Sequence, residues 1–270
     1  MPELPEVETI ANGLHKRVAG DRIESVWVGA KPEPLKSPAT EISRVLEGAR
    51  VQRVRRVGKH IVFDLESPGK QDESQWIVHL GMTGRMLVCS PEVETPKHTH
   101  LVAKLGSGRE LRFVDPRRFG RLEVRSGSFR GPGAEPLQVT TQEFSEMFHP
   151  SKAPIKAALL NQKFLHGVGN IYADEALFRA GIRPRRRANS LTRAELGRLH
   201  QALKKVLQAA IAAGGSSISD YVDADGEAGF FQIQHRVYGR EDKPCLKCKT
   251  AIRKIVVAGR GTHYCPGCQK

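Results

Sequence analysis

Apolar residues recur along the first part of the chain with the spacing of a helix and then with that of β-strands. Over residues 5–18 they repeat every three or four positions, which predicts an amphipathic helix; they are Val7, Ile10, Leu14 and Val18. Six runs with branched side chains and near-alternation follow, at residues 22–28, 51–65, 75–89, 101–105, 110–114 and 120–124. This pattern indicates strands that bury one face of a sheet.

Glycines and prolines divide the chain after these runs. Gly84 and residues 106–108 predict hairpin turns between strands. We therefore expect residues 1–130 to form a β-sandwich domain preceded by one helix. The stretch Gly131-Pro132-Gly133 opens a segment, residues 131–150, that we interpret as a linker.

The pattern becomes helical after the linker. Residues 154–160 and 171–180 predict two short helices separated by a glycine-containing turn. Thr192 and Glu195 have the spacing of a capping box, which predicts the start of a longer helix, and Gly214-Gly215 predicts its end. The fold class is therefore α+β with two domains: a sandwich, then a helical section over 151–228 with a small C-terminal part over 229–270.

Four cysteines in that C-terminal part have the spacing of a metal site. Two C-x2-C pairs are separated by sixteen residues, as in structural zinc ribbons; they are Cys245, Cys248, Cys265 and Cys268. Four thiolates complete the coordination shell, so the predicted Zn²⁺ is structural and leaves no open position for catalysis. Cys89 lies in a predicted strand, and we interpret it as a buried residue and not as a nucleophile.

Charge indicates the class of partner. The chain has 270 residues and a formal net charge of +14, which favours a polyanion such as nucleic acid. An anionic membrane surface is the alternative, but no stretch is apolar enough to span a bilayer, and the N-terminus lacks a signal-peptide pattern. We expect a cytoplasmic protein, in which paired cysteines bind metal instead of forming disulfides.

The first residues combine a nucleophile with an acid. Removal of Met1, which the small Pro2 should permit, leaves a secondary amine beside Glu3. An α-amino group has a pKa of about 8, so much more of it is unprotonated at neutral pH than of a lysine. Such an amine can attack a sugar carbon and form an iminium ion that promotes elimination.

Seven motifs, in order along the whole chain, resemble the formamidopyrimidine-DNA glycosylase family. They are PELPEVE at 2–8, VGK at 57–59, HLGMTGRM at 79–86, DPRRFG at 115–120, GVGNIYADE at 167–175, VYGR at 237–240 and the cysteine ribbon. The sister branch, of the endonuclease VIII type, usually opens PEGPE and prefers oxidised pyrimidines. Leu4 and the Arg-Arg-Phe loop favour the oxidised-purine branch.

The resemblance implies a bifunctional DNA glycosylase and AP lyase that excises 8-oxoguanine and formamidopyrimidines by β,δ-elimination. Pro2 would be the nucleophile, Glu3 the acid that protonates the sugar ring oxygen, and Glu6 a residue that orients the N-terminus. Lys59 matches a lysine that contacts phosphate beside the lesion and assists proton transfer. Arg260, on the ribbon hairpin, matches an arginine that grips the flanking phosphates.

The resemblance also implies how double-stranded DNA is held, in a cleft between a sandwich and a helix-two-turn-helix domain. The target base must leave the stack, and three residues would fill the hole: Met82, Arg117 and Phe119. By pattern alone, Met82 and Phe119 would be core residues, and Arg118 would serve as well as Arg117. Asn170 matches a phosphate clamp at a helix start, and Lys156 a further backbone contact.

Other interpretations remain open at this point. The family uses the segment 214–229 as a lid over the extruded base, and we name no base-reading residue in it. The arginine-rich run at 183–187 suits a phosphate-facing patch or a solvated surface equally. An oxidised-pyrimidine glycosylase and, if Met1 is retained, a non-catalytic binder of damaged DNA are the alternative functions. We expect a bacterial monomer without a cofactor in its chemistry.

Overall fold

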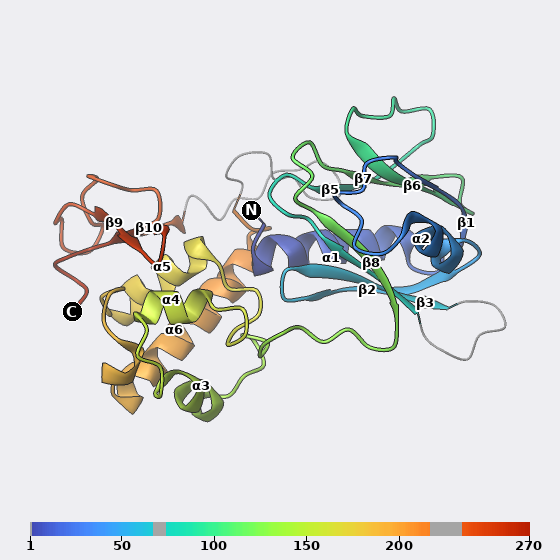
Figure 1. The fold of residues 1–270 in the computed structure, drawn as a ribbon. Helices are drawn as coiled ribbons and strands as arrows, with labels where there is room; N and C mark the ends of the chain where they lie inside the picture. The colour runs from blue at the N-terminus through green and yellow to red at the C-terminus, as the bar shows by residue number, and fades with distance from the viewer. Residues whose placement is uncertain (1, 67–73, 217–233) are drawn as a thin grey trace. The chain divides into compact units, whose positions relative to one another are not determined.

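The chain folds into two compact units (Figure 1). The structure, a computed structural model, describes residues 2–66, 74–216 and 234–270. The first unit contains Met1–Arg130 and Gly214–Gly229, and the second contains Gly131–Ala213 and Phe230–Lys270. The chain thus leaves the first unit after Arg130, returns to it at Gly214 and then enters the second unit again.

The described part of the first unit contains two helices and eight strands. The helices are α1 (Leu4–Val18) and α2 (Ala39–Leu46). The strands are β1 (Ile23–Val28), β2 (Arg50–Val57), β3 (His60–Glu66), β4 (Ser74–His79), β5 (Arg85–Cys89), β6 (Thr99–Leu105), β7 (Glu110–Val114) and β8 (Arg121–Ser126). The predicted strand run 51–65 is therefore two strands, because Gly58 turns the chain with a φ of +60°.

The strands form two antiparallel four-stranded sheets. Their orders are β1-β6-β7-β5 and β2-β3-β4-β8. The hairpin predicted at residues 106–108 is confirmed, since β6 and β7 pair on either side of it. The hairpin predicted at Gly84 is wrong. Strands β4 and β5 belong to different sheets, and the turn at residues 80–84 carries the chain from one sheet to the other.

One apolar core joins both sheets and the two helices, which confirms the sandwich. It takes Val7 and Leu14 from α1, Phe63 from one sheet and Phe113 from the other, all fully buried. Phe63 stacks on Trp76 with ring centroids 4.6 Å apart. Each such side chain contributes about 1.5–3 kcal/mol on burial, so this core fixes where α1 begins relative to the strands.

The second unit is mainly helical in its described part and ends in a small hairpin. Its elements are α3 (Thr141–Phe148), α4 (Ile155–Leu160), α5 (Asn170–Ala180), a 3-10 turn (Ala188–Ser190), α6 (Arg193–Ala212), β9 (Arg253–Val257) and β10 (Arg260–Tyr264). Helix α6 starts at the predicted capping box, where the Glu195 amide donates to the Thr192 hydroxyl at 3.2 Å. Figure 1 shows the β9–β10 hairpin beside α5.

The segment 131–150 is more than the linker that we expected. It contains α3, whose Phe144 and Phe148 are fully buried and pack against each other, with tilted rings and centroids 4.4 Å apart. Thr140 and Glu143 form a capping box at its start, and Thr141 contacts His200 of α6 at 2.9 Å. This segment therefore belongs to the packed core of the second unit.

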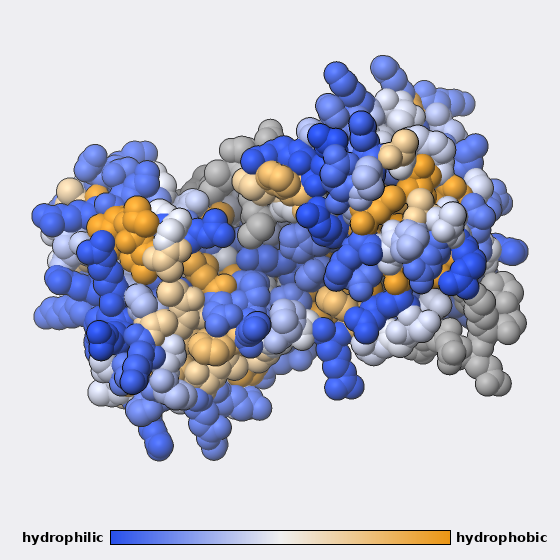
Figure 2. All heavy atoms as spheres, in the orientation of Figure 1, coloured by the Kyte–Doolittle hydropathy of each residue, from blue (hydrophilic) through white to orange (hydrophobic). Residues whose placement is uncertain are grey.

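The surface shown in Figure 2 is mostly hydrophilic, and its apolar residues gather in separate patches. This agrees with 43 lysine and arginine residues against 29 acidic ones. Among the described residues, the large apolar side chains that stay exposed include Met82 at 42% and Phe119 at 50%.

Candidate functional site

The start of α1 places two buried carboxyl groups directly after Pro2. Glu3 is the residue before the helix, and its backbone N–H donates to Glu6 Oε2 at 2.8 Å. Glu3 is 4% exposed and Glu6 is 2% exposed, whereas Pro2 is half-buried. The positive end of the helix dipole favours acids at this position. An amine at residue 2 would therefore lie next to an acid that the fold holds in place.

Glu6 also contacts the point where the chain returns to the first unit. The Ser216 N–H donates to Glu6 Oε1 at 2.8 Å. Gly215 has a φ of +84°, which disfavours other residues, and a Cβ there would lie only 3.0 Å from Glu6 Cγ. The carboxylate thus joins the N-terminus to residue 216. The expected lid lies almost wholly in 217–233, outside the described residues, as does Met1.

Lys59 lies in the turn between β2 and β3. It is only 7% exposed and so is not a solvated surface lysine. Arg56 holds this turn near α1: its Nη1 donates to the Gly58 carbonyl at 3.2 Å, and its Nε pairs with Glu8 Oε2 at 2.5 Å. Burial lowers the pKa of the adjacent His60 to about 4. His60 is therefore neutral at physiological pH.

Met82 and Phe119 lie in two separate turns and are both exposed, although the pattern alone would make them core residues. Met82 lies between β4 and β5, and Phe119 between β7 and β8. The Arg117 guanidinium lies over the Phe119 ring, 4.8 Å from its centroid. Arg118 points to a different partner, Glu33, at 2.7 Å. The structure thus distinguishes the two arginines and groups Arg117 with Phe119.

In the second unit, Asn170 opens α5 after a glycine turn. Gly169 precedes the helix and Gly167 has a φ of +118°. Gln162 supports the turn, because its amide accepts from the Gly167 N–H at 3.0 Å and donates to the Val168 carbonyl at 2.9 Å. The helix N-terminus and the glycine amides have the chemistry of a phosphate site.

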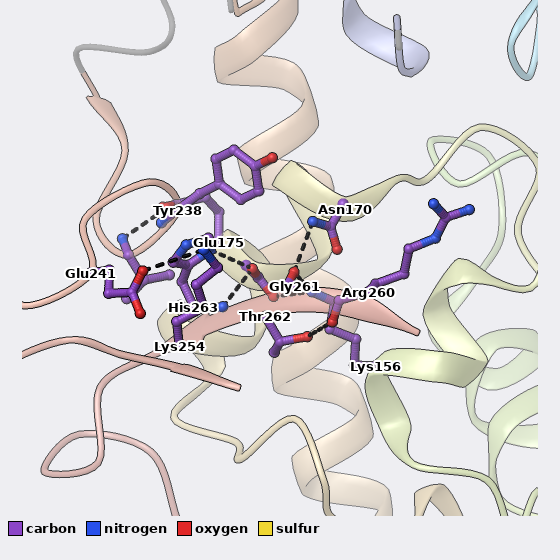
Figure 3. A network of polar contacts seen from close by, with 12 residues as sticks. Lys156, Asn170, Glu175, Tyr238, Glu241, Lys254, Arg260, Gly261, Thr262 and His263 are labelled. Atoms are coloured by element: carbon purple, nitrogen blue, oxygen red, sulfur yellow. Dashed lines mark hydrogen bonds and ion pairs between the residues drawn. The ribbon is translucent and has the colours of Figure 1, made fainter. Parts of the chain in front are cut away.

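The Asn170 side chain is tied to the β9–β10 hairpin through Gly261 (Figure 3). Asn170 Nδ2 donates to the Gly261 carbonyl at 2.9 Å. The neighbouring Arg260 opens β10 after a turn at Gly259, which has a φ of +71°. Arg260 is exposed, and its guanidinium extends away from the other labelled residues in Figure 3. The hairpin therefore presents a cation next to the helix start.

Lys156 does not reach the surface. Its side chain is fully buried, and Nζ lies 2.5 Å from Asp174 Oδ1 and 3.3 Å from the Gly261 carbonyl. The other oxygen of Asp174 accepts from the His263 N–H at 2.9 Å. A direct contact between Lys156 and DNA would require the ammonium to leave this buried pair. In the described structure it instead supports the same glycine as Asn170.

Sequence reasoning assigns no role to Asp174 or to its neighbour Glu175. Glu175 is fully buried and accepts backbone N–H bonds from Arg236, Val237 and Tyr238 at 2.9–3.0 Å. Burial raises the pKa of Glu175, and these backbone donors oppose that rise. The available signal was a pair of adjacent acids among the mainly apolar residues of the predicted helix 171–180.

The four predicted metal ligands come together in one cluster. One ligand atom from each of Cys245, Cys248, Cys265 and Cys268 lies within 4.8 Å of the others. A zinc–sulfur distance of about 2.3 Å in a tetrahedron needs sulfurs roughly 3.8 Å apart, so the cluster fits Zn²⁺. Cys89 lies apart from it on β5. The zinc is structural, and it holds the residues on both sides of the β9–β10 hairpin.

The arginine-rich run at 183–187 is partly structural. Arg186 forms two contacts with Glu195, at 2.6 and 3.2 Å, which lower the pKa of that carboxyl to about 2. Arg183 Nε donates to the Gln269 carbonyl at 2.9 Å. These two side chains therefore join the C-terminal residues and α6 to the turn after α5.

Comparisons with known proteins follow the same division of the chain. The formamidopyrimidine-DNA glycosylase N-terminal domain matches residues 1–122, and the H2TH domain of that enzyme matches 131–222. A zinc finger found in FPG and IleRS matches residues 242–270. In the described part of the chain, no helix is long and apolar enough to cross a membrane.

Individual relatives match over their full length. The formamidopyrimidine-DNA glycosylase of Desulfitobacterium hafniense (strain DCB-2) is 44% identical over 281 residues and that of Bacillus subtilis is 40% identical over 280, with 99–100% of each chain covered. A Lactococcus lactis FPG mutant in complex with Fapy-dG DNA has a TM-score of 0.90 at 34% identity, with 100% of both chains covered. MutM with DNA containing carbocyclic 8-oxo-G has a TM-score of 0.89 at 34% identity, also with full coverage.

Proposed function

The chain belongs to the formamidopyrimidine-DNA glycosylase family, and from this premise we propose how its residues excise oxidised purines from duplex DNA. It is a DNA glycosylase and AP lyase. The observation that carries the assignment of roles is the start of α1, where buried Glu3 and Glu6 directly follow Pro2. Because Pro2 and Glu3 are adjacent in the chain, the amine and the acid can act on the same sugar.

Pro2 is the nucleophile once Met1 has been removed. Its nitrogen forms a bond to the anomeric carbon while the bond to the damaged base breaks, and the base leaves with a proton. Glu3 protonates the ring oxygen, which opens the sugar and leaves an iminium ion. Loss of a proton from the next carbon then expels the 3′ phosphate, and a second elimination expels the 5′ phosphate.

Lys59 acts from the β2–β3 turn. Its position is fixed because Arg56 ties this turn to Glu8 of α1. A buried ammonium is a strong partner for a phosphate, because little water competes for the charge. We assign Lys59 to the phosphate beside the lesion, where it also assists the proton transfers.

Met82, Arg117 and Phe119 fill the space that the extruded base leaves. Phe119 and Met82 are half-exposed apolar side chains on turns, as a wedge between stacked bases requires. Arg117 is already oriented by the Phe119 ring, and a guanidinium can hydrogen-bond the cytosine that has lost its partner. These three residues determine how much free energy the extrusion of a base requires.

Asn170 and Arg260 hold the DNA backbone. Asn170 lies at a helix N-terminus and Arg260 on an exposed hairpin, and both are tied to Gly261. The zinc ligands fix this hairpin without taking part in the chemistry. The excess of positive charge adds a contribution to binding that does not depend on sequence and weakens with salt.

A lesion panel with a Glu3 variant tests this function. Duplexes with 8-oxoguanine opposite cytosine, a formamidopyrimidine or an oxidised pyrimidine are mixed with wild-type, Glu3→Gln or Glu24→Gln protein. Glu24 is an exposed acid on β1 and serves as the matched control. We expect purine lesions to be cut fastest, Glu3→Gln to lose at least about a hundredfold in excision while binding survives, and Glu24→Gln to act as wild type.

Two results would contradict the proposal. Faster excision of oxidised pyrimidines than of purines would move the chain to the endonuclease VIII type. Full excision by Glu3→Gln would remove Glu3 from its assigned role, whatever the lesion preference.

A further inference from the structure

The turn with Met82 and the turn with Arg117 and Phe119 are joined by one buried carboxylate, that of Asp115. Asp115 is fully buried and directly follows β7. Its Oδ1 accepts from the Thr83 hydroxyl at 2.6 Å, and Thr83 is the neighbour of Met82. Thirty-two residues of chain separate the two partners. A short hydrogen bond thus connects turns that the sequence places far apart.

The same carboxylate holds the second turn from inside. Its Oδ2 accepts from the Gly120 N–H at 2.7 Å and its Oδ1 from the Arg117 N–H at 3.2 Å. These bonds fix the residues on both sides of Phe119. In the bond between the two side chains the Thr83 hydroxyl is the donor. The Thr83 hydroxyl oxygen in turn accepts a hydrogen bond from the Arg117 N–H at 3.4 Å.

The two turns also touch through their backbones. A Cβ on Gly81, which has a φ of +62°, would lie 2.5 Å from the Phe119 carbonyl carbon. Between Arg117 and Phe119, Arg118 has a left-handed φ of +57°, which is unfavourable for a side chain of this kind. The turn therefore has a strained conformation that needs support, and the Asp115 bonds supply it.

We propose that Asp115 and Thr83 are positioning residues that hold Met82, Arg117 and Phe119 as one rigid unit. This rests on the roles assigned to those three residues in the proposed function. Met82 and Phe119 are half-exposed and lie on different turns, so the hydrogen bonds beneath the turns help to fix their positions relative to each other. Preorganisation by the shared carboxylate would let them enter the DNA together, so that Arg117 meets the opposite base in one orientation.

Thr83 offers a matched pair of variants. Thr83→Val keeps the shape and removes the hydroxyl, whereas Thr83→Ser keeps the hydroxyl. Single-turnover excision of 8-oxoguanine is measured opposite cytosine and opposite adenine, together with cleavage at a preformed abasic site and thermal unfolding. A role in stability alone would change the unfolding temperature but leave the cytosine-to-adenine rate ratio unchanged.

We expect Thr83→Val to lower excision opposite cytosine by about tenfold and to bring the cytosine-to-adenine ratio towards one. Cleavage at the abasic site, which has no base to extrude, should change by less than about twofold. Thr83→Ser should stay within about twofold of wild type in all three assays. Equal rate ratios in Thr83→Val and wild-type protein would overturn the proposal.

A binding measurement separates this proposal from the proposed function. The fluorescence of 2-aminopurine placed beside the lesion rises when a side chain enters the stack, with or without chemistry. If wild-type protein excises no base, the proposed function fails. The rate at which the 2-aminopurine fluorescence rises, called the fluorescence step here, still tests the role of Thr83. We expect that step to slow about tenfold in Thr83→Val and not in Thr83→Ser. The same rate in all three proteins would overturn the positioning role.

Discussion

Lys156 and Asp174 form a fully buried ion pair, with Nζ 2.5 Å from Oδ1, beneath the glycine that joins Asn170 to the Arg260 hairpin. Lys156 comes from α4, Asp174 from α5 and Gly261 from β10. The pair thus connects three elements of the second unit. A buried charge without its partner lowers the stability of the folded state, so Lys156 and Asp174 each need the other.

Replacing Lys156 with methionine should destabilise the protein. Lys156→Met keeps the aliphatic stem but leaves the Asp174 carboxylate buried without its cation, a loss of about 3–5 kcal/mol. Chemical denaturation with a signal from the second unit measures this. DNA binding should weaken as well, because the Gly261 carbonyl of the hairpin loses a side-chain donor.

The salt dependence of DNA binding separates this role from a direct phosphate contact. If Lys156 touched phosphate, Lys156→Met would lower the slope of log affinity against log salt by about one and leave stability unchanged. The exposed Arg260 provides the comparison: Arg260→Gln should change the salt slope without changing stability. Lys156→Met with wild-type stability and a reduced slope would contradict the buried role.

Removal of one zinc ligand should release the metal and weaken DNA binding. Cys248→Ala leaves three thiolates, which no longer close the tetrahedral shell. Metal analysis should find about one zinc per wild-type chain and much less in the variant. Cys89→Ala removes a thiol outside the cluster, so it should keep both zinc and affinity. Full zinc content and wild-type affinity in Cys248→Ala would contradict the assignment.

His60 should make the folded state less stable in acid. Its pKa is lowered to about 4: burial is the largest cause and Lys36 and Lys59 act in the same direction, while a backbone hydrogen bond with Val57 and the charge of Glu123 oppose them. The unfolded chain binds the proton near pH 6.5, before the folded state does, so stability falls as the pH drops from about 6.5 to about 4. The loss is at most roughly 3 kcal/mol and is complete below the folded pKa.

Replacement by phenylalanine should remove this part of the pH dependence. Urea midpoints at several values between pH 4 and pH 7.5 give the stability of wild-type and His60→Phe protein, and their difference isolates His60 from the other histidines. His149→Gln changes an exposed histidine and should follow the wild-type curve. Parallel curves for His60→Phe and wild type would show that His60 does not titrate as stated.

The sequence predicts best where one short signal determines one local structure. Thr192 and Glu195 are three residues apart, and their capping box starts α6 as expected. The cysteine pairs predict the cluster because each C-x2-C turn fixes two thiolates. Helices α2 and α3, of eight residues each, were not predicted.

Relationships between distant residues could not be predicted in this way. Gly84 indicates a turn, but the choice between a hairpin and a crossing of sheets depends on how β5 pairs with β7. Lys156 resembles any basic helix residue until Asp174, eighteen positions later, is found against it. Met82 and Phe119 look like core residues because pattern does not reveal that both turns face outward. The family motifs identified these two residues, whereas the contacts of their turns with Thr83 and Asp115 could be seen only in the folded structure.

The most direct test of the account is borohydride trapping with a labelled duplex that contains 8-oxoguanine opposite cytosine. Intact mass first shows whether the protein has lost Met1 and so has a free amine at Pro2. We predict a covalent protein–DNA band, and peptide mapping should place the adduct on Pro2, because borohydride reduces the iminium ion to a stable amine. Binding without a trapped band, by protein that lacks Met1, would contradict the central claim, as would an adduct on Lys59.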